Sequence, residues 1–190
     1  MPSYGWLLDP KRCIECRACE AACKQWNGVD TGTGVRWRQV RVSEKGTFPA
    51  VATQALSLAC NHCDRPLCLM ACPLKAYYRR PDGVIILDQT KCVGCRYCLK
   101  WCPYGAPQFN QRTGKMEKCT MCADRIDAGL APACASACPT GALRWGRWEE
   151  IASQGVDQVE NFSTPVTTRP AIRFITGHWK SRDTEARTWR

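Results

Sequence analysis

Sixteen cysteines dominate this 190-residue sequence, and they fall into four groups of four. In chain order the groups are Cys13, Cys16, Cys19 and Cys23; Cys60, Cys63, Cys68 and Cys72; Cys92, Cys95, Cys98 and Cys102; and Cys119, Cys122, Cys134 and Cys138. Groups one and three have the form C-x2-C-x2-C-x3-C, whereas the middle gap widens to four residues in group two and eleven in group four. Proline follows the last cysteine of groups two to four, and Lys24 takes that place in group one. The chain is therefore an internal repeat, and its cysteines set the fold.

The spacing within each group favours a cubane iron–sulfur cluster. Three cysteines spaced by two residues cannot share one face of a helix, but a loop around a cluster can direct all three sulfurs toward iron. The fourth cysteine lies past that loop, and in two-cluster ferredoxins it ligates the other cluster. Structural zinc instead uses two C-x2-C pairs separated by a longer stretch, and only group four approaches that pattern. The groups therefore predict four [4Fe–4S] clusters and no zinc.

The overall composition also requires an organiser other than apolar burial. Leu, Ile, Val and Phe make up about a sixth of the chain, and the formal net charge is +10, a combination typical of disorder. The opening segment MPSYGWLLDPKRC lacks the features of a secretory signal, so an exported disulfide scaffold is not expected. Cluster-bound thiolates would reduce the net charge to roughly +2. Because the Lys and Arg residues are also scattered, we expect no nucleic-acid binding. No apolar run is long enough to form a membrane-spanning helix, so no direct membrane span is expected.

Between the groups, the sequence predicts short strands, turns and helices. Strands are expected over residues 4–9, 35–42 and 141–146, and a hairpin over 76–88 with its turn at Pro81-Asp82-Gly83. A helix is expected over residues 17–26, and each such helix would carry the fourth cysteine of its group. Residues 155–190 lack cysteine but retain Trp179, Trp189 and several Arg residues. We interpret this segment as an extended arm on a partner subunit in preference to a disordered tail.

Several motifs resemble a known family. CNHCDRPLCLMACP, CVGCRYCLKWCPYGAPQFN and KCTMCADRIDAGLAPACASACPTGAL are similar to sequences in the iron–sulfur electron-transfer subunits of the dimethyl sulfoxide reductase family of molybdopterin oxidoreductases, closest to anaerobic dimethyl sulfoxide reductase. The resemblance covers roughly residues 4 to 150 and implies an α+β fold of two ferredoxin-like dicluster halves. One half would combine groups one and four (residues 1–46 plus 103–154), and the inserted half groups two and three (47–102). Residues 155–190 would form the partner-binding arm.

The resemblance also implies how the cysteines divide among the clusters. Cluster 1 would use Cys13, Cys16, Cys19 and Cys138; cluster 2 Cys23, Cys119, Cys122 and Cys134; cluster 3 Cys60, Cys63, Cys68 and Cys102; and cluster 4 Cys72, Cys92, Cys95 and Cys98. Some relatives replace a third-group cysteine by tryptophan and hold a three-iron cluster. All four cysteines of group three are present here, so four four-iron clusters are expected.

Other polar and aromatic residues near the cysteines are expected to support the clusters and not to ligate iron. His62 lies between two cysteines, but group two already supplies four thiols, so packing or a hydrogen bond is favoured over iron ligation. Lys24, Lys100 and Lys118 could raise cluster potentials, although surface lysines are usually solvated. Trp101 and Tyr104 flank Cys102 and are expected to pack over cluster edges. No Ser/His/Asp set, P-loop or dinucleotide motif accompanies them, so no catalytic site is expected on this chain.

By resemblance, the function is electron transfer within an anaerobic respiratory complex. The implied partners are a catalytic subunit with molybdenum or tungsten bis-pterin and a separate membrane anchor with quinone. The chain would be membrane-associated through a partner, on the periplasmic face in preference to the cytoplasmic one. The alternatives are a soluble polyferredoxin, the relay subunit of a hydrogenase or formate-linked complex, and a structural zinc module.

Overall fold

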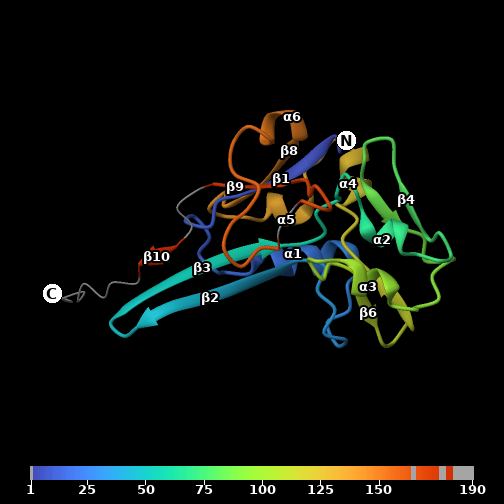
Figure 1. Ribbon diagram of the computed structural model, residues 1–190, viewed down its shortest axis with the longest axis horizontal. Helices are drawn as coiled ribbons and strands as arrows, with labels where there is room; N and C mark the ends of the chain where they lie inside the picture. The colour runs from blue at the N-terminus through green and yellow to red at the C-terminus, as the bar shows by residue number, and fades with distance from the viewer. Residues whose placement is uncertain (1, 164–165, 176–178, 182–190) are drawn as a thin grey trace.

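Short strands and short helices build the computed structural model, which describes residues 2–163, 166–175 and 179–181 (Figure 1). The strands are β1 (Tyr4–Leu8), β2 (Gln39–Thr47), β3 (Ala50–Leu58), β4 (Tyr77–Arg79), β5 (Ile85–Leu87), β6 (Gln108–Asn110), β7 (Lys115–Glu117), β8 (Leu143–Arg147), β9 (Ile172–Phe174) and β10 (Lys180–Ser181). The helices are α1 (Ala18–Asn27), α2 (Leu67–Met70), α3 (Tyr97–Trp101), α4 (Ala123–Asp127), α5 (Ala133–Ser136) and α6 (Trp148–Ile151). The predicted α+β class is confirmed.

One three-stranded sheet joins distant parts of the chain. Its order is β8-β1-β9, with β1 antiparallel to β8 and parallel to β9. The apolar run of β1 buries Trp6, Leu7 and Leu8. The strands expected over 4–9 and 141–146 are thus present as β1 and β8.

The longest strands form the β2–β3 hairpin, which projects to the left of the body in Figure 1. We expected a strand over 35–42, but β2 begins at Gln39 and extends to Thr47. Residues 35–38 lead into the strand instead, because the Val35 carbonyl accepts a hydrogen bond from Lys24 Nζ at 2.8 Å and Arg38 turns into the interior. The hairpin crosses the expected boundary between residues 46 and 47, and the domain limits stay a prediction.

Two small hairpins lie toward the other end of the molecule. The β4–β5 hairpin has the turn predicted at Pro81-Asp82-Gly83, where the Arg80 N–H donates to the Val84 carbonyl at 2.9 Å. Gly83 takes a φ of +82°, a conformation that favours glycine. The second hairpin pairs β6 with β7.

The short helices hold the third cysteine of each group. α1, α2, α3 and α5 contain Cys19, Cys68, Cys98 and Cys134, respectively. The expectation that each helix carries the fourth cysteine is correct only for α1, which also contains Cys23. In the other groups the helix ends earlier, because the proline after the fourth cysteine disfavours helical backbone at the residue before it. Lys24 imposes no such limit, so α1 continues to Asn27.

The described part of the C-terminal segment packs against other elements of the same chain. Phe162 stacks on Tyr104 with ring centroids 5.0 Å apart and meets the edge of Phe174 at 4.9 Å. β9 joins β1, and β10 pairs with β3. Trp179 donates to Glu160 at 2.8 Å and lies under Lys45. Trp189 lies outside the described residues, and contact with a partner stays a prediction.

Cysteines are prominent in both clusters of buried side chains. The larger cluster surrounds Trp6, Leu143 and Phe174 and includes Cys13, Cys19, Cys23, Cys60, Cys119 and Cys134. The smaller cluster surrounds Tyr77, Ile85 and Met116 and includes Cys68, Cys92 and Cys98. Within the described part of the chain, no helix has the length and apolar character needed to cross a bilayer.

Candidate iron–sulfur cluster sites

Site 1 is a small cavity lined by three cysteines of group one and the last cysteine of group four: Cys13, Cys16, Cys19 and Cys138. Strand pairing explains how they meet. Leu8 at the end of β1 lies opposite Leu143 at the start of β8, so the segment after β1 and the segment before β8 emerge at the same end of the sheet. The Leu143 N–H donates to Cys138 Sγ at 3.4 Å. Although burial would raise the pKa of Cys138, this bond and others from nearby groups lower it.

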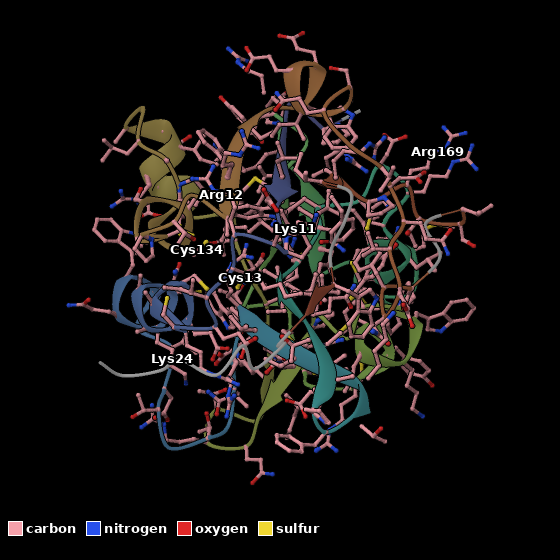
Figure 2. All side chains as sticks on the ribbon, turned by 90° about the vertical axis from the view of Figure 1, so that its left-hand side faces the viewer. Lys11, Arg12, Cys13, Lys24, Cys134 and Arg169 are labelled. Atoms are coloured by element: carbon pink, nitrogen blue, oxygen red, sulfur yellow. The ribbon has the colours of Figure 1, made fainter. Side chains whose placement is uncertain are left out.

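Site 2 is the predicted set Cys23, Cys119, Cys122 and Cys134, and all four cysteines are buried. α1 packs against α5, and this contact brings Cys23 near Cys134. Burial and then the charge of Cys134 raise the pKa of Cys23 to about 12. Asn27, one turn after Cys23, donates from Nδ2 to Cys122 Sγ at 3.6 Å. In Figure 2, Cys134 of site 2 and Cys13 of site 1 lie inside the molecule, whereas Arg169 lies at its edge.

Site 3 is a second cavity, lined by three cysteines of group two and the last cysteine of group three: Cys60, Cys63, Cys68 and Cys102. Cys60 follows shortly after the end of β3, and α3 ends directly before Cys102. Burial raises the pKa of Cys63, and the neighbouring Cys60 and Cys102 raise it further. Burial followed by Cys60 likewise raises the pKa of Cys68 to about 12.

His62 and Tyr104 line the site 3 cavity without being needed as ligands. His62 is 1% exposed, and its Nδ1 accepts a hydrogen bond from the Ile85 N–H at 3.0 Å. Burial, and then the charges of Lys118 and Arg38, lower the pKa of His62 well below its usual range. Tyr104 is also buried, and its hydroxyl lies 2.6 Å from Thr168 Oγ1. Trp101, expected to cover a cluster edge, is 57% exposed.

Site 4 is the predicted set Cys72, Cys92, Cys95 and Cys98. Cys98 has Cys92 and Cys95 as charge neighbours. Cys72 packs against the smaller core cluster, which contains Cys92 and Cys98. Backbone N–H groups donate to sulfur here as well: Ala76 to Cys72 at 3.3 Å and Met116 to Cys92 at 3.5 Å. Cys95 is exposed to solvent.

The donor chemistry of these sites fits iron–sulfur clusters. None of the sixteen cysteines forms a disulfide bond, and thiolates are the usual ligands of such clusters. Burial raises the pKa of several thiols, Cys119 among them, so ligation is what would hold them as thiolates. Among the described residues, no three His, Cys, Asp or Glu side chains are arranged around a single metal ion. At sites 1 and 3 the thiols instead line small cavities.

The positive charges near the sites divide into exposed and buried residues. Lys100 is exposed, as expected for a solvated surface lysine. Lys24 donates hydrogen bonds to the carbonyls of Asp30 and Val35. Lys118 differs, because it is 3% exposed and donates to the Cys119 carbonyl at 2.9 Å. Arg38 is 2% exposed, and its burial was not predicted. Within residues 35–42, no local signal in the sequence marks Arg38 as different from Arg36.

Comparison with known proteins identifies similar sequences. A family model described as a 4Fe-4S dicluster domain matches residues 51–148. The thiosulfate reductase electron transfer subunit PhsB of Salmonella typhi is 41% identical over 152 residues, which cover 80% of this chain and 79% of that protein. The B subunit of anaerobic dimethyl sulfoxide reductase from Escherichia coli K12 is 38% identical over 162 residues (81% and 78%). Its namesake from Haemophilus influenzae is 35% identical over 183 residues (90% and 88%).

Proposed function

The chain belongs to the family of iron–sulfur electron-transfer subunits of dimethyl sulfoxide reductase-type molybdopterin oxidoreductases, and we propose that it relays electrons between two partners through four [4Fe–4S] clusters. One partner is a catalytic subunit with molybdenum or tungsten bis-pterin, and the other is a membrane anchor with quinone. The cysteine sets would be sites 1 to 4. This chain itself is the electron-transfer subunit and not the catalytic one.

The electrostatic proximity of cysteines in successive sites carries the proposal. Cys134 of site 2 has Cys19 of site 1 as a charge neighbour. Cys119 of site 2 likewise has Cys60 of site 3, and Cys68 of site 3 has Cys98 of site 4. When bound, each cluster supplies one-electron redox chemistry. These neighbours support a row of sites from site 4 to site 1, along which electrons from quinol would travel.

The protein leaves a cysteine exposed at each end of this row and buries all four cysteines of site 2. Cys95 of site 4 and Cys16 of site 1 are exposed, whereas every cysteine of site 2 is buried. Solvent access and burial are among the features by which a protein tunes a cluster. Electrons would enter and leave at the two exposed ends.

An apolar surface beside site 4 supports the anchor as the partner at that end. Val93, Tyr97 and Trp101 are 67%, 51% and 57% exposed, and Met70 on the adjacent α2 is 73% exposed. A surface of large exposed apolar side chains typically marks a protein interface. Membrane association through this partner, on the periplasmic face, completes the proposal.

Metal content is the first test. We expect about 16 iron and 16 acid-labile sulfide per anaerobically purified chain, with negligible zinc. Elemental analysis and sulfide assay of the same sample measure both quantities. Stoichiometric zinc in place of iron would contradict the proposal.

The crossed cysteine sets are tested by two serine substitutions in the intact complex. Cys95→Ser should alter the signal of site 4 and reduce quinol-driven turnover to background, while an artificial donor that enters at the catalytic subunit still supports turnover. Cys138→Ser should instead alter site 1 and leave the site 4 signal intact. Electron paramagnetic resonance spectra of the two variants distinguish these effects. If Cys138 shared a cluster with Cys119, Cys122 and Cys134, the crossed sets would be wrong.

A further inference from the structure

Arg38 is a buried cation between sites 1 and 2. It lies directly before β2 with 2% of its surface exposed, and its guanidinium carbon sits 4.3 Å from the centre of the Trp6 ring. Nη1 donates to the Ser57 carbonyl at 3.0 Å and to Ser57 Oγ at 3.3 Å. Nε and Nη2 are buried and have no nitrogen or oxygen partner among the described residues, while the side chain lies within hydrogen-bonding reach of the Cys134 thiol. Two donor groups of a charged side chain are thus left for sulfur to satisfy.

No carboxylate in the described part of the chain forms an ion pair with Arg38. The acidic residue beside this segment, Glu20, is already engaged, because its Oε1 accepts from the Val40 N–H at 2.6 Å and its carboxylate pairs with Arg17 and Arg36. A buried guanidinium without an anionic partner is strongly unfavourable. The compensating charge must therefore come from another kind of group.

The groups around Arg38 that can supply negative charge are cysteines. Cys134, Cys119 and Cys23 belong to site 2, and Cys19 belongs to site 1. Ser57 extends the connection to site 1, because its Oγ lies 3.3 Å from Cys19 Sγ while also accepting from Arg38. Arg38 thus contacts Ser57, and Ser57 contacts Cys19 of site 1. The guanidinium of Arg38 also has three thiols of site 2 as charge neighbours.

We propose that Arg38 is the shared buried counter-charge of sites 1 and 2, with Nε and Nη2 donating to sulfur at site 2 and Nη1 fixing Ser57 against Cys19. The inference rests on the proposed cysteine sets. Addition of one electron to a cluster adds one negative charge, which a fixed nearby cation stabilises, so the reduction potential is higher with Arg38 than without it. Arg38 is a positioning residue: it sets the potentials at the buried middle of the row and does not itself exchange electrons.

The test compares Arg38→Gln with Arg38→Lys in the anaerobically purified holo-complex, and Arg36→Gln is the matched control. Arg36 lies two residues away, is half-exposed and pairs with Glu20. We expect Arg38→Gln to lower the equilibrium constant for one-electron reduction of the cluster at site 1 or site 2 at least tenfold. This corresponds to a fall of about 59 mV in its midpoint potential. Arg38→Lys should recover part of that shift, and Arg36→Gln should leave all potentials unchanged. Redox titration followed by electron paramagnetic resonance measures each cluster.

Ser57→Ala provides a second variant that keeps the buried charge. It should lower the potential at site 1 and leave that at site 2 close to the wild-type value, even if Arg38→Gln fails to assemble. Unchanged potentials at sites 1 and 2 in an iron-replete Arg38→Gln complex would overturn the inference. If Arg38→Gln lacks iron, unchanged potentials in both Arg38→Lys and Ser57→Ala would do so instead. Iron content of the wild-type complex separately tests the proposed function, so the two failures are distinguishable.

Discussion

Gly94 illustrates how a single residue shapes a cysteine loop. It lies between Cys92 and Cys95 with a φ of +72°, and a Cβ added there would lie 2.1 Å from the Gly114 carbonyl oxygen and 3.0 Å from the Phe109 ring. Gly114 has a similar φ of +66° but open space around the added Cβ. Both positions favour glycine for its backbone conformation, but only Gly94 is also closely packed.

The two glycines therefore make a matched pair of variants. Gly114→Ala should lower the free energy of unfolding by about 1–2 kcal/mol through backbone strain alone. Gly94→Ala should cost about 1–3 kcal/mol more because the backbone around Cys95 must move, and it should reduce iron occupancy at site 4. Denaturant unfolding and iron analysis of both iron-loaded variants measure these effects. Equal losses in the two variants would show that the close contact at Gly94 does not matter.

At the residue scale, the sequence predicts ligand chemistry better than buried charge. Cysteine spacing is a local property, so the chemistry of the sixteen thiols can be predicted before any tertiary contact is known, while their division among four sites stays a prediction. His62 could be assigned a hydrogen bond in place of iron ligation because group two already has four cysteines. Arg38 and Lys118 could not be identified as buried, since their burial depends on contacts with segments far away in the chain.

At the scale of elements, local rules predicted β1, β8, the β4–β5 hairpin and α1. They were less accurate where a ligand loop or a tertiary contact decides the boundary. β2 starts four residues later than expected because Val35 and Arg38 are held by other parts of the molecule. β9 was not predicted, because residues 155–190 contain few aliphatic side chains and the partner strand β1 lies at the opposite end of the chain.

β9 gives the C-terminal segment a structural role that a substitution can test. Phe174 is fully buried between Phe162 and the β1 sheet, whereas Val166 in the same segment is 78% exposed. Phe174→Ala should lower the free energy of unfolding by about 3–5 kcal/mol, and Val166→Ala should change it by less than about 0.5 kcal/mol. Thermal unfolding of the iron-loaded chain measures both. A nearly neutral Phe174→Ala would mean that this segment contributes little to the core.

At the scale of the whole molecule, the cysteines occupy the places where an ordinary domain would have aliphatic side chains. Nine of them are buried within the two core clusters. The predicted sets of sites 1 to 4 combine cysteines from segments far apart in the sequence, so bound clusters would cross-link those segments. Such ligation contributes directly to folding stability, because an unfolded chain cannot preform the sites.

Removal of iron should therefore unfold the chain. With Leu, Ile, Val and Phe at about a sixth of the residues, apolar burial alone is too small to offset the conformational entropy of an ordered chain. Without iron, buried neighbouring thiols such as Cys119 and Cys134 would also lose the ligation that links their segments. We expect chelation under anaerobic, reducing conditions to abolish cooperative melting and most of the far-ultraviolet circular dichroism, and reconstitution with iron and sulfide to restore both. The reductant excludes disulfide formation as the cause. An iron-free chain that melts cooperatively with a native spectrum would show that the protein matrix, and not cluster ligation, supplies the stability.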